Sequence, residues 1–182
     1  MKKVKIEKTN RLLDDFFKVD EAYLQFEKFD GTMSPSVRRL NFERGDGVAA
    51  LVFNEDTDRI ILIRQFRYAA YTKNEGWVIE TVAGMLADGE KPEEAITREI
   101  EEEVGYKNAA LTHIHTFFVS PGGSSERIFL YYAVVNNENK IHEGGGLGSE
   151  EEDIQVLEYH FEELQELMAA EMIMDAKTLI AL

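Results

Sequence analysis

The sequence predicts an α/β protein built around a mixed sheet, with a small antiparallel sheet ahead of it. Two observations support this prediction. Strand-like apolar runs from residue 48 onward are interrupted by a helical stretch, and the first 45 residues contain stretches that alternate apolar and polar side chains. A length of 182 residues suits one domain of ordinary size with a small appendage. We therefore expect an N-terminal sheet over residues 1–45 and a larger domain over residues 46–182.

The N-terminal part has the pattern of a hairpin with one buried face. Residues 23–29 (YLQFEKF) alternate along the chain, and Asp30 and Gly31 follow as turn residues. A sheet of this size is marginal by itself in water and gains stability by packing against a partner.

The larger part combines strands and helices. Five apolar runs are expected as strands: 48–53, 60–63, 78–82, 111–119 and 128–135. A helix is expected over Pro92–Val104, because Pro and acids occupy the first turn and Gly105 stands at the C-terminal cap position. A second helix is expected over residues 161–172, and Asp175 is expected to cap a last short helix.

Composition excludes several function classes. Cysteine is absent, which excludes disulfides, Cys-ligated zinc or iron–sulfur sites and any Cys nucleophile. The longest apolar run is far below the roughly 20 residues that cross a bilayer, so a cytoplasmic protein is expected. The net charge of -15 should repel nucleic acid and anionic membranes. Much of the acid lies in residues 84–103 and 150–153, a concentration that predicts a bound cation.

The acidic helix carries three carboxylates in an unusual place. On a helical wheel, Ile96, Ile100 and Val104 form the core stripe, and the acids at 99, 102 and 103 fill an arc of about 100° beside it. Carboxylates at such spacing repel one another, and a hard cation such as Mg²⁺ or Mn²⁺ offsets the repulsion. The alternatives are a solvated charge run and an acidic cation-buffering protein, although no EF-hand spacing is present.

The segment GMLADGEKPEEAITREIEEEVGY, residues 84–106, resembles the Nudix box at every fixed position. The fixed positions are Gly84, Glu90, Arg98, Glu99, Glu102, Glu103 and Gly105. Tyr106 stands where the family usually has an aliphatic residue, at a position that packs and does no chemistry. So many fixed positions at set spacing are a far stronger signal than a lone glycine motif.

The resemblance implies an α/β/α Nudix sandwich that hydrolyses a nucleoside diphosphate linked to another group with divalent metal. Glu99, Glu103 and the backbone carbonyl of Ala83 would be the metal ligands, with Glu102 as an additional carboxylate. Arg98 would orient a glutamate through a charge-assisted hydrogen bond, and Glu90 would brace the loops around the helix.

Segments outside the box are similar to the ADP-ribose pyrophosphatase branch, with GDP-mannose hydrolases as near relatives. They are VRRLNFERG (37–45), LIRQFRYAAY (62–71), ETVAGM (80–85), SPGGSSER (120–127) and EEEDIQV (150–156). By position, the resemblance implies these substrate-binding residues: Arg67, Arg39, Phe16, Glu80 and Ser120. Glu152 is the candidate general base, with Glu150 as the second choice, on a loop that glycines 144–148 would make mobile.

The expected function is therefore Mg²⁺-dependent cleavage of a nucleotide sugar, with Mn²⁺ able to substitute. ADP-ribose would yield AMP and ribose 5-phosphate, and GDP-mannose would yield GMP and mannose 1-phosphate. The resemblance also implies a homodimer with exchanged N-terminal sheets. The alternative from another class is a catalytically silent Nudix module that senses ADP-ribose or a nucleotide sugar.

Overall fold

The chain divides into two compact units. The first comprises Met1–Asp46 and Phe118–Arg127, and the second comprises Gly47–Phe117 and Ile128–Leu182. The computed structural model describes residues 2–148 and 152–182. In this part of the chain, no helix is long and apolar enough to cross a membrane.

The first unit is a three-stranded antiparallel sheet in the order β1-β2-β3. The strands are β1 (Val4–Asp14), β2 (Lys18–Phe26) and β3 (Val37–Glu43). The expected turn lies between β2 and β3, where Gly31 adopts a φ of +83°. The segment after residue 117 joins this sheet, because the Phe42 amide donates to the Gly123 carbonyl at 2.8 Å. The predicted small antiparallel sheet is confirmed.

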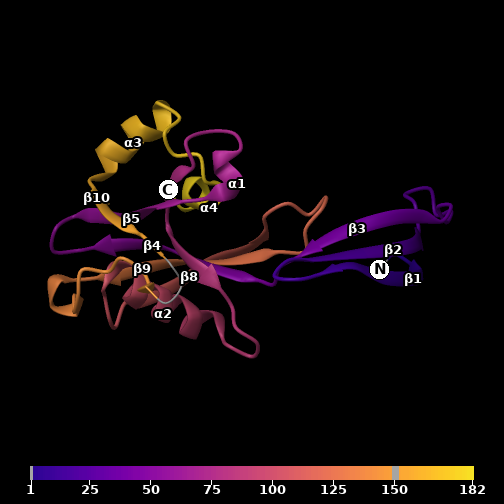
Figure 1. The fold of residues 1–182 in the computed structure, drawn as a ribbon, viewed down its shortest axis with the longest axis horizontal. Coiled ribbons are helices and arrows are strands. Elements are labelled where there is room, and N and C mark those ends of the chain that lie inside the picture. Colours follow the sequence, from indigo (N-terminus) through magenta and orange to yellow (C-terminus); the bar gives the residue numbers. More distant parts are fainter. Residues whose placement is uncertain (1, 149–151) are drawn as a thin grey trace. The chain divides into compact units, whose positions relative to one another are not determined.

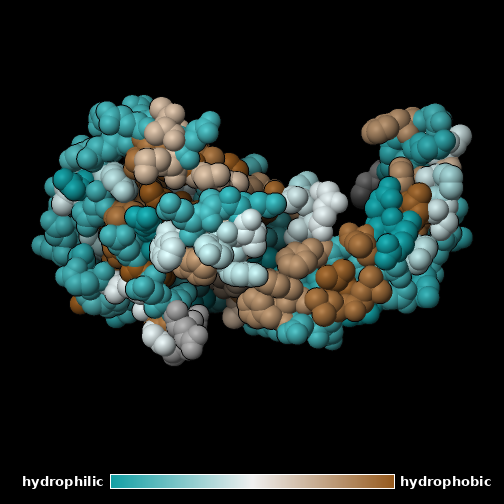
Figure 2. Space-filling model, turned by 45° about the horizontal axis from the view of Figure 1, so that its top comes forward, coloured by the Kyte–Doolittle hydropathy of each residue, from teal (hydrophilic) through white to brown (hydrophobic). Residues whose placement is uncertain are grey.

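Many apolar side chains of this sheet lie exposed at its surface. They are Val4, Ile6, Leu12, Leu13, Phe16, Phe17, Tyr23, Phe26, Leu40 and Phe42. Apolar surface is visible on this unit at the right of the view (Figure 2). A three-stranded sheet with so much exposed apolar area offers a surface that a partner could cover.

The second unit contains a seven-stranded mixed sheet, which confirms the predicted fold class (Figure 1). Its main path runs in the order β10-β5-β4-β9-β8, and β6 and β7 pair with β5 and β4. The pairing of β4 with β9 is parallel, whereas β4 pairs with β5 in antiparallel register. The strands are β4 (Gly47–Asn54), β5 (Arg59–Phe66), β6 (Trp77–Glu80), β7 (Val82–Met85), β8 (Ala110–Phe118), β9 (Arg127–Val135) and β10 (Gln155–Tyr159).

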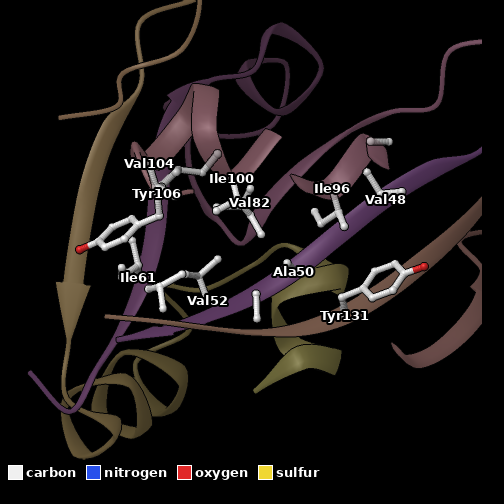
Figure 3. Packing of buried hydrophobic residues seen from close by; sticks show 14 of the residues in the cluster. Val48, Ala50, Val52, Ile61, Val82, Ile96, Ile100, Val104, Tyr106 and Tyr131 are labelled. Carbon is white, nitrogen blue, oxygen red and sulfur yellow. The ribbon is translucent and has the colours of Figure 1, made fainter. Parts of the chain in front are cut away.

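Helices cover both faces of this sheet, because the side chains of β4 alternate between two cores. Even-numbered residues of β4 pack with helix α2 (Pro92–Val104), as Figure 3 shows for Val48, Ala50 and Val52. The odd-numbered Leu51 belongs to a second cluster with Leu164 of α3 (Phe161–Ala169). The remaining helical segments are α1 (Tyr68–Tyr71), a 3-10 turn (Asn137–Asn139) and α4 (Ala176–Ala181).

Two sequence predictions need correction, and one strand was missed. The run 78–82 is not one strand, because the chain changes partner at Thr81: β6 pairs with β5, and β7 pairs with β4. The second helix ends at Ala169 rather than at residue 172. Strand β10 was not predicted.

Thr81 itself is fully buried where the partner changes. Its hydroxyl donates to the Ala50 carbonyl of β4, and its amide donates to the Thr178 hydroxyl of α4 at 2.7 Å. Asp175 caps α4 as predicted, accepting from the Thr178 amide at 2.9 Å. Helix α4 thus completes the hydrogen bonding at this break in the strand.

Candidate active site at the acidic helix

Helix α2 has the predicted bounds and buries the predicted stripe. Pro92 occupies the first turn, and Gly105 ends the helix with a φ of +79° while its amide donates to the Glu101 carbonyl at 3.0 Å. Ile96, Ile100 and Val104 are fully buried (Figure 3). Burial of this stripe fixes the rotation of the helix and therefore the direction in which each acid points.

Glu103 is the most buried acid of the helix, with only 2% of its surface exposed. Its carboxylate accepts a hydrogen bond from the Ala83 amide at 3.2 Å. Burial, followed by the charges of Glu99 and Glu152, raises the pKa of Glu103 well above its ordinary value. A buried carboxylate facing two other carboxylates is costly unless a cation compensates it.

Glu99 lies over Gly84 of β7. A β-carbon on Gly84 would overlap the Glu99 carboxyl group, so the missing side chain creates the space that this acid occupies. Burial raises the pKa of Glu99 in spite of the neighbouring Arg98. The box therefore requires glycine at this position because a side chain would collide with Glu99.

Arg98 bridges the acids around the helix. Its guanidinium donates to Glu99 at 2.8 Å and to Glu102 at 3.0 Å, and it pairs with Glu90 at 3.3 Å. Burial alone would lower the pKa of Arg98, but these acids raise it above its ordinary value. Glu90 also accepts from the Ala87 amide at 3.0 Å, which fits its expected bracing role.

Ala83 brings a backbone group to the same place. In a strand, the N–H and C=O of one residue point to the same side. The Ala83 amide donates to the Glu103 carboxylate at 3.2 Å, and Ala83 lies opposite Ala49 of β4, so the Ala83 backbone is next to the acidic helix. This position next to Glu103 is consistent with the expected role of the Ala83 carbonyl as an oxygen ligand.

The loop after β9 brings Glu152 to the acidic helix. Its charge contributes to the raised pKa values of both Glu99 and Glu103, so the three carboxylates share one electrostatic environment. The Leu147 amide donates to the Glu152 carboxylate at 3.0 Å. The second candidate base, Glu150, lies outside the described residues.

Arg67 and Glu80 form an ion pair at 2.7 Å, with Glu80 almost fully buried. Burial alone would lower the pKa of Arg67, but hydrogen bonds to Glu80 and the nearby charges of Glu80, Glu103 and Asp175 raise it. The guanidinium is therefore held next to the carboxylate cluster. Sequence reasoning missed Asp175 as a neighbour of this site and Lys177, which pairs with Asp175 at 2.6 Å.

The other expected substrate-binding residues lie in the first unit. Phe16 is 80% exposed and contacts Phe17 edge to face, with 4.8 Å between ring centroids. Arg39 is exposed and donates to the Arg38 carbonyl at 2.9 Å. Ser120 is exposed, and its carbonyl accepts the amides of Gly123 and Ser124.

Comparison with known proteins identifies the family. The NUDIX domain family matches residues 43–182. The chain belongs to the Nudix family. This confirms the predicted family, and the site on α2 is the Nudix box of this chain.

Relatives match the Nudix chain over nearly its whole length. "GDP-mannose pyrophosphatase" of Cronobacter sakazakii (strain ATCC BAA-894) is 35% identical over 181 residues, covering 98% of this chain and 93% of that protein. A protein of the same name from Escherichia coli O1:K1 / APEC is 35% identical over 173 residues, 94% and 88% of the two chains.

A solved structure titled "Crystal structure of ADP compounds hydrolase" has the same fold. It superimposes with a TM-score of 0.73 at 20% identity, covering 98% of this chain and 90% of that chain. The Nudix sandwich, the small antiparallel sheet and the hydrolase class are confirmed by these comparisons together.

The donor set of the Nudix box fits a hard divalent cation, the kind of metal that the family uses. Glu99, Glu103 and the Ala83 carbonyl offer oxygen atoms only, and the buried carboxylates repel one another. Among the described residues, no three side chains of the kinds Asp, Glu, Cys or His lie arranged so that they could together hold a metal ion.

The cation-free Nudix site should destabilise the fold as the pH rises. The pKa of Glu103 is higher in the folded than in the unfolded state. Its contribution to the free energy of unfolding is therefore fully present below the pKa of the unfolded state, about 4.3. That contribution is lost as the pH rises through the pKa of the folded state. We expect the melting temperature of wild type, relative to Glu103→Gln, to fall over this range in EDTA. Saturating Mg²⁺ should reverse the difference at neutral pH. A difference that is independent of pH would contradict the buried, repelled state of Glu103.

Proposed function

We propose that the chain hydrolyses the diphosphate of nucleoside diphosphate sugars, with GDP-mannose as the preferred substrate. The products are GMP and mannose 1-phosphate. ADP-ribose is a second substrate of the same reaction, giving AMP and ribose 5-phosphate. The support is the Nudix carboxylate cluster beside Arg67, in a chain about 35% identical over nearly its full length to GDP-mannose pyrophosphatases.

In this proposal Mg²⁺ is held through Glu99, Glu103 and the Ala83 carbonyl, with Glu102 as a further acid. Bound there, the ion would polarise the diphosphate and acidify the attacking water. Glu152 accepts the proton from that water, because its carboxylate lies in the same electrostatic environment as the ligands. Arg98 holds Glu99 and Glu102 in place through its two short ion pairs.

Arg67 binds the diphosphate. A guanidinium can make paired hydrogen bonds to phosphate oxygens, and such a local cation is needed in a chain of net charge -15. Glu80 binds Arg67 through both Nε and Nη2, which fixes the plane of the guanidinium. Glu80 therefore contributes to substrate binding through Arg67.

Nucleotide-base recognition is proposed for the first unit. Phe16 and Arg39 expose an aromatic ring and a guanidinium, the two groups that stack on a base. Ser120 would assist from the adjoining segment. The exposed apolar sheet supports a homodimer with exchanged N-terminal sheets, and a monomer in light scattering at micromolar concentration would refute it.

The test is phosphate release coupled to a phosphatase, which acts on the monoester products and not on the intact diphosphate. The substrates are GDP-mannose, ADP-ribose, other nucleotide sugars and diadenosine polyphosphates, each with Mg²⁺ or Mn²⁺. We expect turnover of GDP-mannose first and ADP-ribose second, both abolished by EDTA. Tight binding of a nucleotide sugar without turnover would identify a silent sensor instead, although every carboxylate of the box is present.

A further inference from the structure

The segment Gly144–Leu147, here called the glycine anchor, caps the end of the acidic helix. The last carbonyl groups of a helix lack partners within the helix. The Gly145 amide donates to the Glu103 carbonyl at 2.9 Å, and the Gly146 amide donates to the Glu102 carbonyl at 3.1 Å. The anchor therefore binds the backbone of the residues whose side chains form the Nudix carboxylate cluster.

The same segment holds the candidate base. The Leu147 amide donates to the Glu152 carboxylate at 3.0 Å, and the Glu152 amide donates back to the Leu147 carbonyl at 3.4 Å. The Ile154 amide donates to the Gly145 carbonyl at 3.3 Å, and Ile154 is buried in the core that α2 covers. Both ends of the loop that carries Glu152 are thus tied to helix α2 or to its core.

Side chains would not fit in the anchor. A β-carbon on Gly144 would overlap the Glu103 carbonyl and lie 2.7 Å from Val104 Cα. A β-carbon on Gly146 would lie 2.6 Å from Glu152 Oε2 and 3.0 Å from Ile154 Cδ1. Both glycines have a positive φ, of +75° and +80°. The mobility expected for glycines 144–148 stays a prediction; in the structure, the amides of Gly145 and Gly146 are bonded to carbonyls of helix α2.

We infer that the glycine anchor sets the position of Glu152 relative to Glu99 and Glu103, and that Gly146 is a positioning residue for hydrolysis. The inference rests on the proposed function, in which Glu152 takes the proton from the attacking water. One turn of chain bonds to the ligand-bearing helix on one side and to the base on the other. The base and the metal ligands are therefore connected through one short run of backbone, which sets the distance between them.

Gly146→Ala tests this directly. The new methyl group must displace the Glu152 carboxylate, so we expect kcat for GDP-mannose to fall by about 10²-fold, the loss typical of a misplacement of about 1 Å. KM and the Mg²⁺ concentration for half-maximal rate should stay within about 3-fold, because Arg67, Glu99 and Glu103 are untouched.

Two glycine variants serve as matched controls. Gly148→Ala places a methyl group in the same loop where no atom of residues 2–148 or 152–182 lies within 4 Å. Gly31→Ala places one in open space at a φ of +83°, which reproduces the backbone strain of Gly146→Ala without a collision. Both should keep kcat within about 2-fold of wild type. A fall in kcat for Gly31→Ala as large as that for Gly146→Ala would overturn the inference, since strain alone would then explain it.

The double variant separates positioning from general stability. If Gly146 acts through Glu152, adding Gly146→Ala to Glu152→Gln should lower kcat by less than about 3-fold, although each change alone costs far more. Losses that multiply would overturn the inference, as would a Glu152→Gln variant with wild-type kcat. If either result overturns the inference, turnover of GDP-mannose by the wild type would still support the proposed function. If the wild type does not turn over GDP-mannose, the proposed function is refuted by that result alone.

Amide hydrogen exchange provides a readout that needs no activity. In the free protein, the Gly145 and Gly146 amides should exchange at least about 10²-fold more slowly than the Gly148 amide, because they are bonded to the helix. Exchange of all three at the rate of an unprotected amide would overturn the inference, whatever the kinetics show.

Discussion

Glu103→Gln is expected to lower kcat/KM for GDP-mannose by about 10²-fold or more. The substitution keeps the shape of the side chain and an oxygen for the Ala83 amide, so the local fold should survive. It removes the charge that the carboxylate cluster offers to a divalent cation. Phosphate release coupled to a phosphatase, measured across a range of Mg²⁺ concentrations, gives the loss and the change in metal requirement together.

The matched control is Glu101→Gln on the same helix. Glu101 pairs with Lys107 at 3.2 Å and, at about 100° per residue, lies roughly 160° around the helix from Glu103. A partly exposed pair of this kind contributes little to stability. We expect its activity within about 2-fold of wild type. Equal losses in the two variants would mean that overall charge, and not Glu103 as a ligand, matters.

The same substitution should stabilise the metal-free fold at neutral pH. Glu103 is buried and faces Glu99 and Glu152, which is unfavourable when all three are ionised. Gln removes that repulsion, and each 1 kcal/mol gained raises the melting temperature of a chain of this size by about 2–4 °C. A variant with lower activity and higher stability than the wild type is typical of a substitution in an active site, where residues are kept for function at a cost in stability.

Gly84→Ala is expected to lower kcat/KM by about 10²-fold and to raise the Mg²⁺ requirement by about 10-fold. The new methyl group would overlap the Glu99 carboxyl group, which is the end of a flexible side chain. The carboxylate therefore moves while the backbone stays. The φ of Gly84 is not positive, so Ala adds no backbone strain.

Gly148→Ala is again the control, because its φ is ordinary and its methyl group meets no atom within 4 Å in the described part of the chain. Titration of each variant with Mg²⁺, followed by activity and by melting temperature, separates lost metal binding from lost folding. A Gly84→Ala enzyme with wild-type rate and Mg²⁺ requirement would show that the position of Glu99 over Gly84 has no role in metal binding.

The acidic helix could be read from sequence because its signals are local. Pro at the start, Gly105 at the end and the apolar stripe all lie within one stretch of chain, and the observed bounds are those predicted. The same wheel placed Glu103 at the edge of the apolar stripe, where the structure buries it. Local periodicity thus predicted both the helix and the position of Glu103 beside its buried stripe.

Features that depend on distant partners could not be read this way. Residues 78–82 form one apolar run in the sequence, but the structure divides it, because its first part pairs with β5 and its last part pairs with β4. Strand β10 alternates only weakly and gains its strand character from pairing with β5. The glycine anchor looked like a mobile loop because the helix carbonyls that bind its amides lie more than 40 residues earlier.

The bond between Thr81 and Thr178 has a consequence for the order of events during synthesis. The two residues are 97 positions apart, and Thr81 stands between Glu80, which holds Arg67, and β7, which carries Ala83 and Gly84. When the whole acidic helix of a nascent chain has left the ribosome, the Thr81 amide still lacks its hydrogen-bond partner, the Thr178 hydroxyl. The nascent Nudix domain should therefore stay sensitive to proteases until residue 178 has left the ribosome, and ribosome-bound chains stalled before and after that point would reveal the step.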